Sequence, residues 1–277
     1  MNVLSLFDGM SCGQIALNRA GVTVDNYYAS ELDKYAISVT QANYPDTVQL
    51  GDVTRWREWD IDWSSIDLLI GGSPCQGFSF AGEELAFNDP RSALFFVYED
   101  ILNHIKSINP KVKFMLENVK MKKESLNVIS ERLVVSPILI NSSLVSAQNR
   151  NRWYWANWDF GQPDDVGNLL TDILESESNN FTFMSERFIT RQYGRKCLVD
   201  NTDKKAATLC AMEYVKNGRQ GDYVNTNGGY RKLTPIECER LQTVPDDYTN
   251  HVSNTQRYKM LGNGWTVDVI SHIFKSM

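Results

Sequence analysis

The sequence predicts an α/β fold built on a mostly parallel sheet. From Val3 to Trp158, short β-branched and apolar runs alternate with stretches of helical period, which is the pattern of βαβ units. The chain has 277 residues, of which 42% are hydrophobic and 22% charged. A chain of this size can bury the core of one large domain and still form a smaller one.

Each expected strand is a short run of β-branched or apolar residues. In chain order, the strands are expected at residues 3–7, 27–30, 48–50, 68–70, 114–116, 138–140 and 153–155. Helices are expected where apolar residues recur at helical spacing between these runs. They cover residues 13–20, 34–43, 93–105 and 126–133.

The alternation stops after Trp158. Residues 160–229 are rich in Asn, Asp, Ser, Thr and Gly without a clear helical period, which indicates a separate, loop-rich module. Regular structure returns at Thr234-Pro235-Ile236-Glu237, a good helix start, and residues 267–274 are expected to return to the sheet side and close the first domain. The predicted domains are residues 1–159 completed by 254–277, and residues 160–253.

Composition excludes several classes of protein. The N-terminus has no basic segment followed by a long apolar run, and no apolar stretch reaches membrane-spanning length, so we expect an intracellular protein without a membrane partner. The cysteines are odd in number and lack Cys-x-x-Cys spacing, which argues against a disulfide framework and against a metal site. They are Cys12, Cys75, Cys197, Cys210 and Cys238.

The net charge of −6 hides a gradient along the chain. Residues 1–110 hold 6 Lys and Arg against 15 Asp and Glu, a balance of −9, whereas residues 185–232 hold 10 against 5, a balance of +5. The later segment is where a polyanion could dock. A solvated surface explains so modest an excess equally well.

The first candidate site is a strand, a glycine-containing turn and a helix at residues 4–13. Glycines there let the backbone approach a nucleotide-like ligand at the carboxyl edge of the sheet, although such a turn is often plain architecture. Glu31 and Asp52 follow the second and third strands. These carboxylates suit ribose hydroxyls and an adenine amino group respectively; each could instead be a helix N-terminal acid.

The second candidate site is the loop Gly71-Gly72-Ser73-Pro74-Cys75-Gln76-Gly77 after the fourth strand. A buried cysteine is usually a small core residue, but this loop offers few apolar neighbours, so Cys75 is better placed as a nucleophile. Glu117 ends another strand. It could take part in the same chemistry or accept hydrogen bonds from backbone donors.

Six motifs in order resemble the DNA cytosine C5-methyltransferase family, from the first strand to the C-terminus. They are Phe7-Asp8-Gly9, Pro74-Cys75-Gln76, Glu117-Asn118-Val119, Gln148-Asn149-Arg150-Asn151-Arg152, the run from Arg231 to Gln242, and Leu261-Gly262-Asn263-Gly264. The resemblance implies a Rossmann-like S-adenosylmethionine-dependent methyltransferase fold with a small target-recognition domain. Residues 1–159 and 254–277 then form the catalytic and cofactor-binding domain, and residues 160–253 the recognition domain and hinge.

The implied reaction is methylation of cytosine C5 in double-stranded DNA, with S-adenosylhomocysteine as product and no metal. Cys75 would add to cytosine C6, because C5 alone is a poor nucleophile. Glu117 would contact N3, Arg152 would hold O2, and Arg150 would support the loop. A base inside a duplex is out of reach of such a site, so the cytosine must be flipped out.

The resemblance also assigns the binding residues. Phe7 would stack near the adenine, Glu31 would bind the ribose, and Asp52 with Val53 would contact the adenine edge. The remaining cofactor residues are Asp8, Gly9, Gly13, Leu32, Pro74, Leu94, Asn263 and Trp265. The expected DNA contacts are Gln76, Ser79, Arg91, Thr208 and Leu209; Arg91 could equally be a solvated loop charge.

Departures from the family pattern concern its branches. Ser73 and Trp265 stand where Pro and a small aliphatic residue are common, and together with a recognition module of about 70 residues they point toward the de novo branch. The lack of an appended reader domain favours a bacterial or phage enzyme in the cytoplasm of its host cell. No obligate protein partner is expected, and a cognate restriction endonuclease is the candidate partner.

Two rival functions stay open. One branch of the family methylates tRNA, but it carries a Cys-Phe-Thr tripeptide that this sequence lacks. A non-catalytic partner that keeps the fold is the other rival. Cys75, Glu117, Arg150 and Arg152 are all present, which argues against a lost activity.

Overall fold

The chain folds into two compact units. The first comprises Met1–Ile140, Asn151–Gln162 and Ser271–Met277, and the second Asn141–Arg150 and Pro163–Ile270. The structure is a computed structural model that describes residues 1–74, 93–176, 181–192, 197–211 and 222–277. None of the helices within these ranges is long and apolar enough to cross a membrane.

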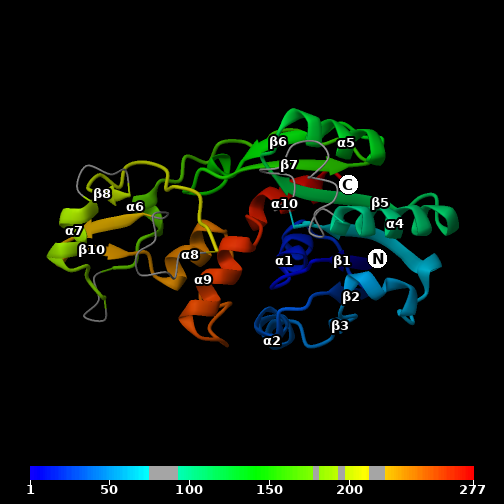
Figure 1. Ribbon diagram of the computed structural model, residues 1–277, viewed down its shortest axis with the longest axis horizontal. Coiled ribbons are helices and arrows are strands. Elements are labelled where there is room, and N and C mark those ends of the chain that lie inside the picture. Colours follow the sequence, from blue (N-terminus) through cyan, green and yellow to red (C-terminus); the bar gives the residue numbers. More distant parts are fainter. Residues whose placement is uncertain (75–92, 177–180, 193–196, 212–221) are drawn as a thin grey trace. The chain divides into compact units, whose positions relative to one another are not determined.

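The first unit is built on a seven-stranded sheet of order β3-β2-β1-β4-β5-β7-β6 (Figure 1). Its strands are β1 (Asn2–Leu6), β2 (Asn26–Ser30), β3 (Val48–Gln49), β4 (Ile66–Gly71), β5 (Lys113–Val119), β6 (Ile138–Asn141) and β7 (Asn151–Ala156). The pairs from β3 to β5 are parallel, and β7 runs antiparallel to β5. All seven expected strands form, so the predicted α/β fold is confirmed.

Helices and short 3-10 turns follow the strands. They are α1 (Cys12–Arg19), α2 (Lys34–Asn43), η1 (Val53–Glu58), η2 (Trp63–Ser65), α4 (Ala93–Ile108) and α5 (Lys123–Leu133). One buried cluster joins apolar residues of α4 and α5 to alternate residues of the central strands, among them Leu4, Leu69 and Phe114. Because strand side chains alternate, Val3, Leu68 and Met115, which are also buried, point to the opposite face.

The C-terminal helix α10 (Val267–Lys275) ends in the first unit. Trp158 Nε1 donates to the carbonyl of Ile273 at 3.1 Å, and Lys113 Nζ donates to the carbonyl of Met277 at 2.9 Å. The last turn of α10 is thereby tied to the start of β5 and to the segment that follows β7.

The second unit contains more regular structure than the sequence predicted. It has η3 (Ser142–Leu144), α6 (Leu170–Ile173), α7 (Glu186–Gln192), α8 (Pro235–Leu241), α9 (Asn254–Asn263) and a sheet of order β10-β9-β8. The strands of this sheet are β8 (Leu198–Val199), β9 (Tyr223–Thr226) and β10 (Gly229–Lys232). Residues 160–229, expected to form a loop-rich module, contain short elements such as α6 and β8, which are too short to show a period in the sequence.

The helix start expected at Thr234 is confirmed. The Thr234 hydroxyl accepts from the backbone N–H of Glu237, while the Glu237 carboxylate accepts from the Thr234 N–H at 2.8 Å. Glu237 also forms a bidentate pair with Arg231, at 2.7 and 2.8 Å, and both side chains are buried. One carboxylate therefore caps α8 and anchors it to β10.

Candidate active site

The loop after β1 has an unusual backbone. Phe7, Gly9 and Ser11 all adopt left-handed conformations, with φ of 57°, 61° and 60°, which is uncommon for residues other than glycine. The Asp8 N–H donates to the carbonyl of Ser30 at the end of β2. The loop therefore folds against the carboxyl edge of the sheet, where parallel α/β proteins bind ligands.

Asp8 sits at the centre of a polar cluster within this loop. Its carboxylate accepts hydrogen bonds from the Tyr27 hydroxyl at 2.7 Å and from the Ser11 hydroxyl. Gln14 extends the cluster, because its side-chain amide donates to Ser11 and to Thr47. Burial raises the pKa of Asp8 to about 6, although the hydrogen bonds oppose the rise.

Glu31 holds the loop with its carboxylate. One oxygen accepts from the Gly9 N–H at 2.8 Å, and the other accepts from the N–H groups of Leu32 and Asp33 at 2.7 and 2.8 Å. A carboxylate has about four lone-pair sites, so one stays open to a ligand hydroxyl. Leu32 is 70% exposed beside it and offers an apolar surface to a flat ring.

Asp52 follows β3 and caps η1. Its Oδ1 accepts from the Thr54 N–H at 2.9 Å and from the Thr54 hydroxyl at 2.8 Å, and these bonds lower the pKa of the carboxyl. Asp52 is therefore a helix N-terminal acid, which was one of the two roles that the sequence allowed for it. Its Oδ2 makes no hydrogen bond to the described residues and can accept from an amino group.

The other expected cofactor residues are divided between the two units. In the first, Gly13 and Val53 are buried, while Pro74, three residues after β4, and Leu94, in the first turn of α4, are half-buried. Asn263 ends α9 and Trp265 follows it, in the second unit. The structure thus groups the first-unit residues at the carboxyl edge of the sheet, and their shared role stays a prediction.

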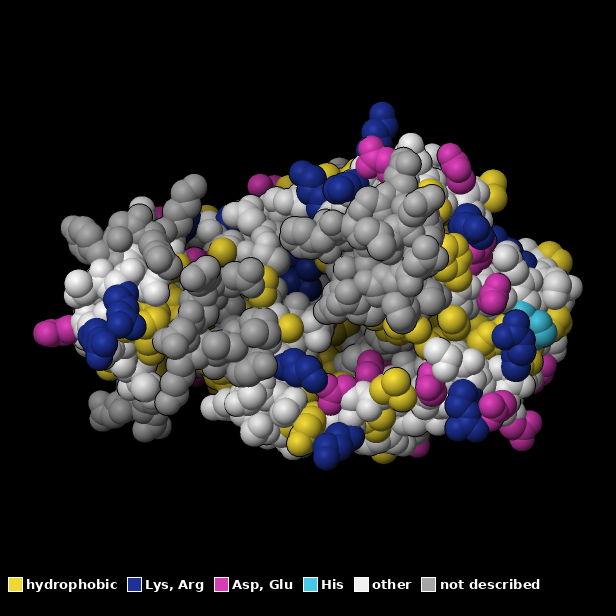
Figure 2. Space-filling view, in the orientation of Figure 1, with side chains coloured by type: hydrophobic (Ala, Val, Ile, Leu, Met, Phe, Trp, Pro, Cys, Tyr) yellow, Lys and Arg dark blue, Asp and Glu magenta, His cyan; other side chains and the backbone are white. Residues whose placement is uncertain are grey.

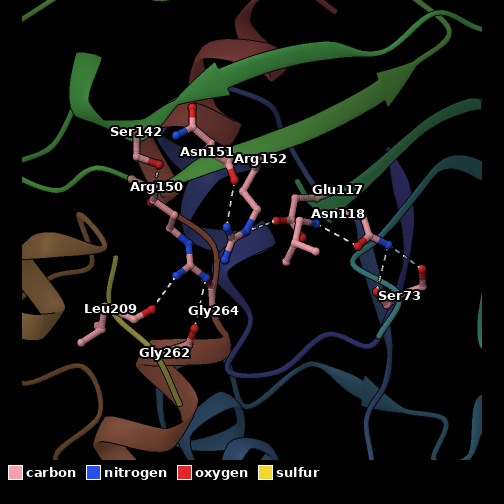
Figure 3. Close-up of polar contacts among 12 residues, drawn as sticks. Ser73, Glu117, Asn118, Ser142, Arg150, Asn151, Arg152, Leu209, Gly262 and Gly264 are labelled. Carbon is pink, nitrogen blue, oxygen red and sulfur yellow. Dashed lines mark hydrogen bonds and ion pairs between the residues drawn. The ribbon is translucent and has the colours of Figure 1, made fainter. Parts of the chain in front are cut away.

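Glu117 and Arg152 form an ion pair on neighbouring strands (Figure 3). Arg152 Nε lies 2.9 Å from Glu117 Oε1, and the side chains are 14% and 12% exposed. They meet because β5 and β7 are antiparallel partners, in a register that sets Val119 opposite Arg152. Glu117 therefore has a charged side-chain partner on the neighbouring strand.

Asn118 connects this strand end to the loop that leads to Cys75. Its side-chain amide donates to the carbonyl and the hydroxyl of Ser73, both at 3.2 Å (Figure 3). Sequence reasoning missed this pair, although Ser73 was noted as a departure from the family pattern. Cys75 comes two residues later and, like Gln76, Ser79 and Arg91, lies outside the described residues.

Arg150 has a different environment from Arg152. It is 3% exposed, and its guanidinium donates to the carbonyls of Leu209, Gly262 and Gly264 at 2.8, 3.1 and 2.8 Å (Figure 3). These contacts join three segments of the second unit. The position fits the supporting role expected for Arg150.

The segment around Thr208 runs beside the start of the Gln148 motif. The Thr208 hydroxyl donates to the carbonyl of Asn149, and the Leu209 N–H donates to Gln148 Oε1 at 3.2 Å. Lys205, in the basic segment, donates to the carbonyls of Ser143 and Ser146. The Lys205 ammonium group therefore connects two segments of the second unit.

The described part of the chain contains no evident metal-binding site. No group of three or more His, Cys, Asp or Glu side chains there could hold a metal ion. The clustered acids Asp8 and Glu31 instead bind hydroxyl and N–H donors.

The fold and the loop at its carboxyl edge define an α/β enzyme of the class that binds a nucleotide-like cofactor. Comparison with known proteins narrows the class. The chain matches C-5 cytosine-specific DNA methylases over residues 1–186 and 167–277. It belongs to this family, whose members generally use S-adenosylmethionine, and is a DNA cytosine-5-methyltransferase.

Curated relatives agree with this assignment, and solved structures share the fold. The chain is 30% identical to the type II methyltransferase M1.ScrFI of Lactococcus lactis, over 99% of this chain and 77% of the relative. It is 31% identical to M.NlaX of Neisseria lactamica, over 99% and 95%. A DNMT2 crystal structure from Spodoptera frugiperda has the same fold, with a TM-score of 0.74, 20% identity and coverage of 99% and 98%.

Proposed function

We propose that this chain methylates cytosine C5 at a short sequence in double-stranded DNA, through a covalent bond between Cys75 and cytosine C6. The observation that carries the proposal is the Glu117–Arg152 pair, which the Asn118–Ser73 hydrogen bonds tie to the loop that continues into Cys75. A fixed acid and a fixed guanidinium can hold a polar ring.

The proposed chemistry starts with attack on the ring. The Cys75 thiolate forms a bond to C6, and the π electron pair of the C5=C6 double bond becomes available at C5. Glu117 contacts N3 and Arg152 contacts O2, where negative charge develops during this step. After C5 accepts the methyl group and loses its proton to a base, the thiolate leaves C6 and the aromatic ring is restored.

S-adenosylmethionine would supply an electrophilic methyl group. The residues at the first three strand ends fit an adenosine moiety. Glu31 keeps one acceptor site for a ribose hydroxyl, Asp52 keeps Oδ2 for the adenine amino group, and Leu32 presents its apolar side chain. In this proposal, Phe7 stacks near the adenine, and Asn263 and Trp265 complete the site.

DNA is proposed to enter with its target base flipped out, since a stacked base would be out of reach of Cys75. Residues 160–253 would choose the site, with Thr208 and Leu209 near the flipped base. The relatives named type II methyltransferases support a cognate restriction endonuclease as a companion enzyme.

Transfer of a labelled methyl group tests the proposal. The purified chain, given labelled S-adenosylmethionine, should label double-stranded DNA, and Cys75→Ser should abolish the signal. Cys197→Ser is the matched control, because Cys197 is a half-buried thiol of the second unit. Labelling of tRNA without labelling of DNA would refute the DNA assignment, and full activity of Cys75→Ser would refute the covalent route.

A further inference from the structure

A pocket in the second unit is not explained by the chemistry at Glu117. It has a volume of about 670 Å³ and is formed by α7, the residues before it and the end of β10. The lining residues are Phe183, Met184, Ser185, Arg187, Phe188, Arg191, Gln192 and Lys232. No acidic side chain is among these described lining residues.

Backbone contacts fix the wall of the pocket. Phe183 forms an antiparallel bridge with Arg231, and the Met184 N–H donates to the carbonyl of Tyr230 at 2.8 Å. The segment before α7 therefore runs along the edge of β10. The Phe183 ring occupies the space over Gly228, where a Cβ atom would lie 2.3 Å from it, and it remains 39% exposed.

Two arginines stand on one face of α7. Arg187 and Arg191 are four residues apart, which places them on adjacent turns, and both are exposed. Neither makes an ion pair with any residue that the structure describes. Between them Phe188 packs on the buried ring of Tyr223, with ring centroids 4.8 Å apart, so the apolar side of the pocket is held in place.

This combination of groups fits a nucleic-acid backbone. Guanidinium groups bind phosphate oxygens in a bidentate manner, and aromatic side chains accept the apolar face of a sugar or base. Most of the lining residues also belong to the basic segment 185–232. Those on α7 lie near its start, and Lys232 is its last residue. In Figure 2, Lys and Arg side chains lie beside hydrophobic ones in the region where Figure 1 places α7.

We infer that this pocket binds a phosphate-and-sugar segment of the DNA substrate, with Arg187 and Arg191 on neighbouring phosphates and Phe183 against the sugar. The inference rests on the proposed function, because DNA is its ligand. Phosphate contacts position a protein on DNA but carry no sequence information. The pocket therefore contributes affinity, while other residues select the methylated site.

Salt-dependent binding tests this assignment. The affinity for a labelled duplex should be measured by fluorescence anisotropy over a series of salt concentrations. Each phosphate contact contributes about 0.9 to the slope of log affinity against log salt, so Arg187→Ala/Arg191→Ala should reduce the slope by about 1.8. Arg187→Lys/Arg191→Lys, which keeps the charges, should keep most of the slope.

The control removes two arginines elsewhere. Arg55 and Arg132 are exposed in the first unit and pair with Glu58 and Glu99, so Arg55→Ala/Arg132→Ala should leave the slope unchanged. Bisulfite sequencing should find the same methylated cytosines for the wild type and the pocket variant, with a raised KM for DNA and an unchanged kcat.

Two results would overturn the inference. One is an unchanged slope in a folded Arg187→Ala/Arg191→Ala variant, and the other is an equal loss of slope in the control. Failure of the proposed function would look different, because the wild type itself would then neither bind nor methylate the duplex.

Discussion

Glu117 and Arg152 restrict each other's side-chain conformations, because each holds the other from a neighbouring strand. Ordered groups lose little entropy when a substrate binds, which favours catalysis. A short link through Asn118 and Ser73 couples the same strand end to the loop before Cys75. The proposed ring-binding groups are thus connected to the segment that ends at Ser73.

Glu117→Gln should lower kcat about 10²- to 10⁴-fold, the usual contribution of a positioned acid or base. The amide keeps the size of the side chain but cannot exchange a proton with N3. Methyl transfer under single-turnover conditions measures the effect. Glu99→Gln removes the partner of Arg132 on the surface and should leave the rate unchanged; an active Glu117→Gln enzyme would contradict the proposed role.

Asp8 should make stability depend on pH. Its pKa is about 6 in the folded chain against an ordinary 3.8, chiefly because it is buried. The folded state therefore keeps a proton that the unfolded state has lost, and the contribution of Asp8 to the free energy of unfolding falls as pH rises from about 4 to about 6.

The variant Asp8→Asn isolates this contribution, since the amide does not titrate. Urea denaturation at about pH 5 and about pH 8 should show that the variant gains stability relative to the wild type at the higher pH. A stability difference that stays constant across this range would mean that Asp8 titrates at its ordinary pKa.

For single residues, the sequence predicted where a residue lies on its strand better than it predicted which side chains are in contact. Glu117 and Glu31 were expected at strand ends and lie there. The pairing of Glu117 with Arg152 depends on the register between β5 and β7, which is a long-range property. The Ser73–Asn118 contact joins the loop after β4 to the end of β5, 45 residues further along the chain, and has no local signal.

Among the elements, α9 passes very close to the segment that contains Cys210. A Cβ atom on Gly262 would lie 2.2 Å from the backbone of Cys210 and Ala211, and the Gly262 carbonyl accepts from Arg150. The family motif at residues 261–264 therefore has a packing reason. Only glycine lets these two backbones approach so closely.

Gly262→Ala should destabilise the protein by about 1–3 kcal/mol, the range for overpacked sites. The sign of this stability change is informative, because alanine in place of glycine normally stabilises a helix by about 0.5–1 kcal/mol. Gly161→Ala is the control, since a Cβ atom there meets nothing within 4 Å. Thermal unfolding of both variants measures the difference; a stabilised Gly262→Ala protein would show that the contact can relax.

The strands of the first unit were predictable because each is a local apolar run, but their order in the sheet was not. β7 lies between β5 and β6 and runs antiparallel to β5, a choice made by packing across the sheet. In the second unit, α6 has four residues and β8 has two. Elements of that length leave no periodic signal.

For the whole molecule, the net charge does not indicate whether the chain binds DNA. The net charge of −6 would disfavour DNA, yet the basic excess is confined to residues 185–232, which contribute Arg187, Arg191 and Lys232 to the pocket. DNA binding should therefore depend on a local surface and weaken steeply with salt.

Bisulfite sequencing of a methylation-free host that expresses the chain should show methylated cytosines at one short sequence. The experiment identifies both the substrate and the sequence that is methylated. Methylation spread over unrelated cytosines would contradict a sequence-specific enzyme, and its complete absence from DNA would favour the tRNA or non-catalytic alternatives.

The central claim is that Cys75 attacks cytosine C6 in DNA, and trapping of the adduct tests it most directly. Release of the enzyme normally requires loss of the proton at C5, and a fluorine atom at C5 cannot leave in this way. A duplex with 5-fluorocytosine at the target should therefore stay bound after methyl transfer. Mass spectrometry of the digested complex should place the methylated base on the peptide that contains Cys75. An adduct on another residue, or no adduct from an active enzyme, would contradict the account.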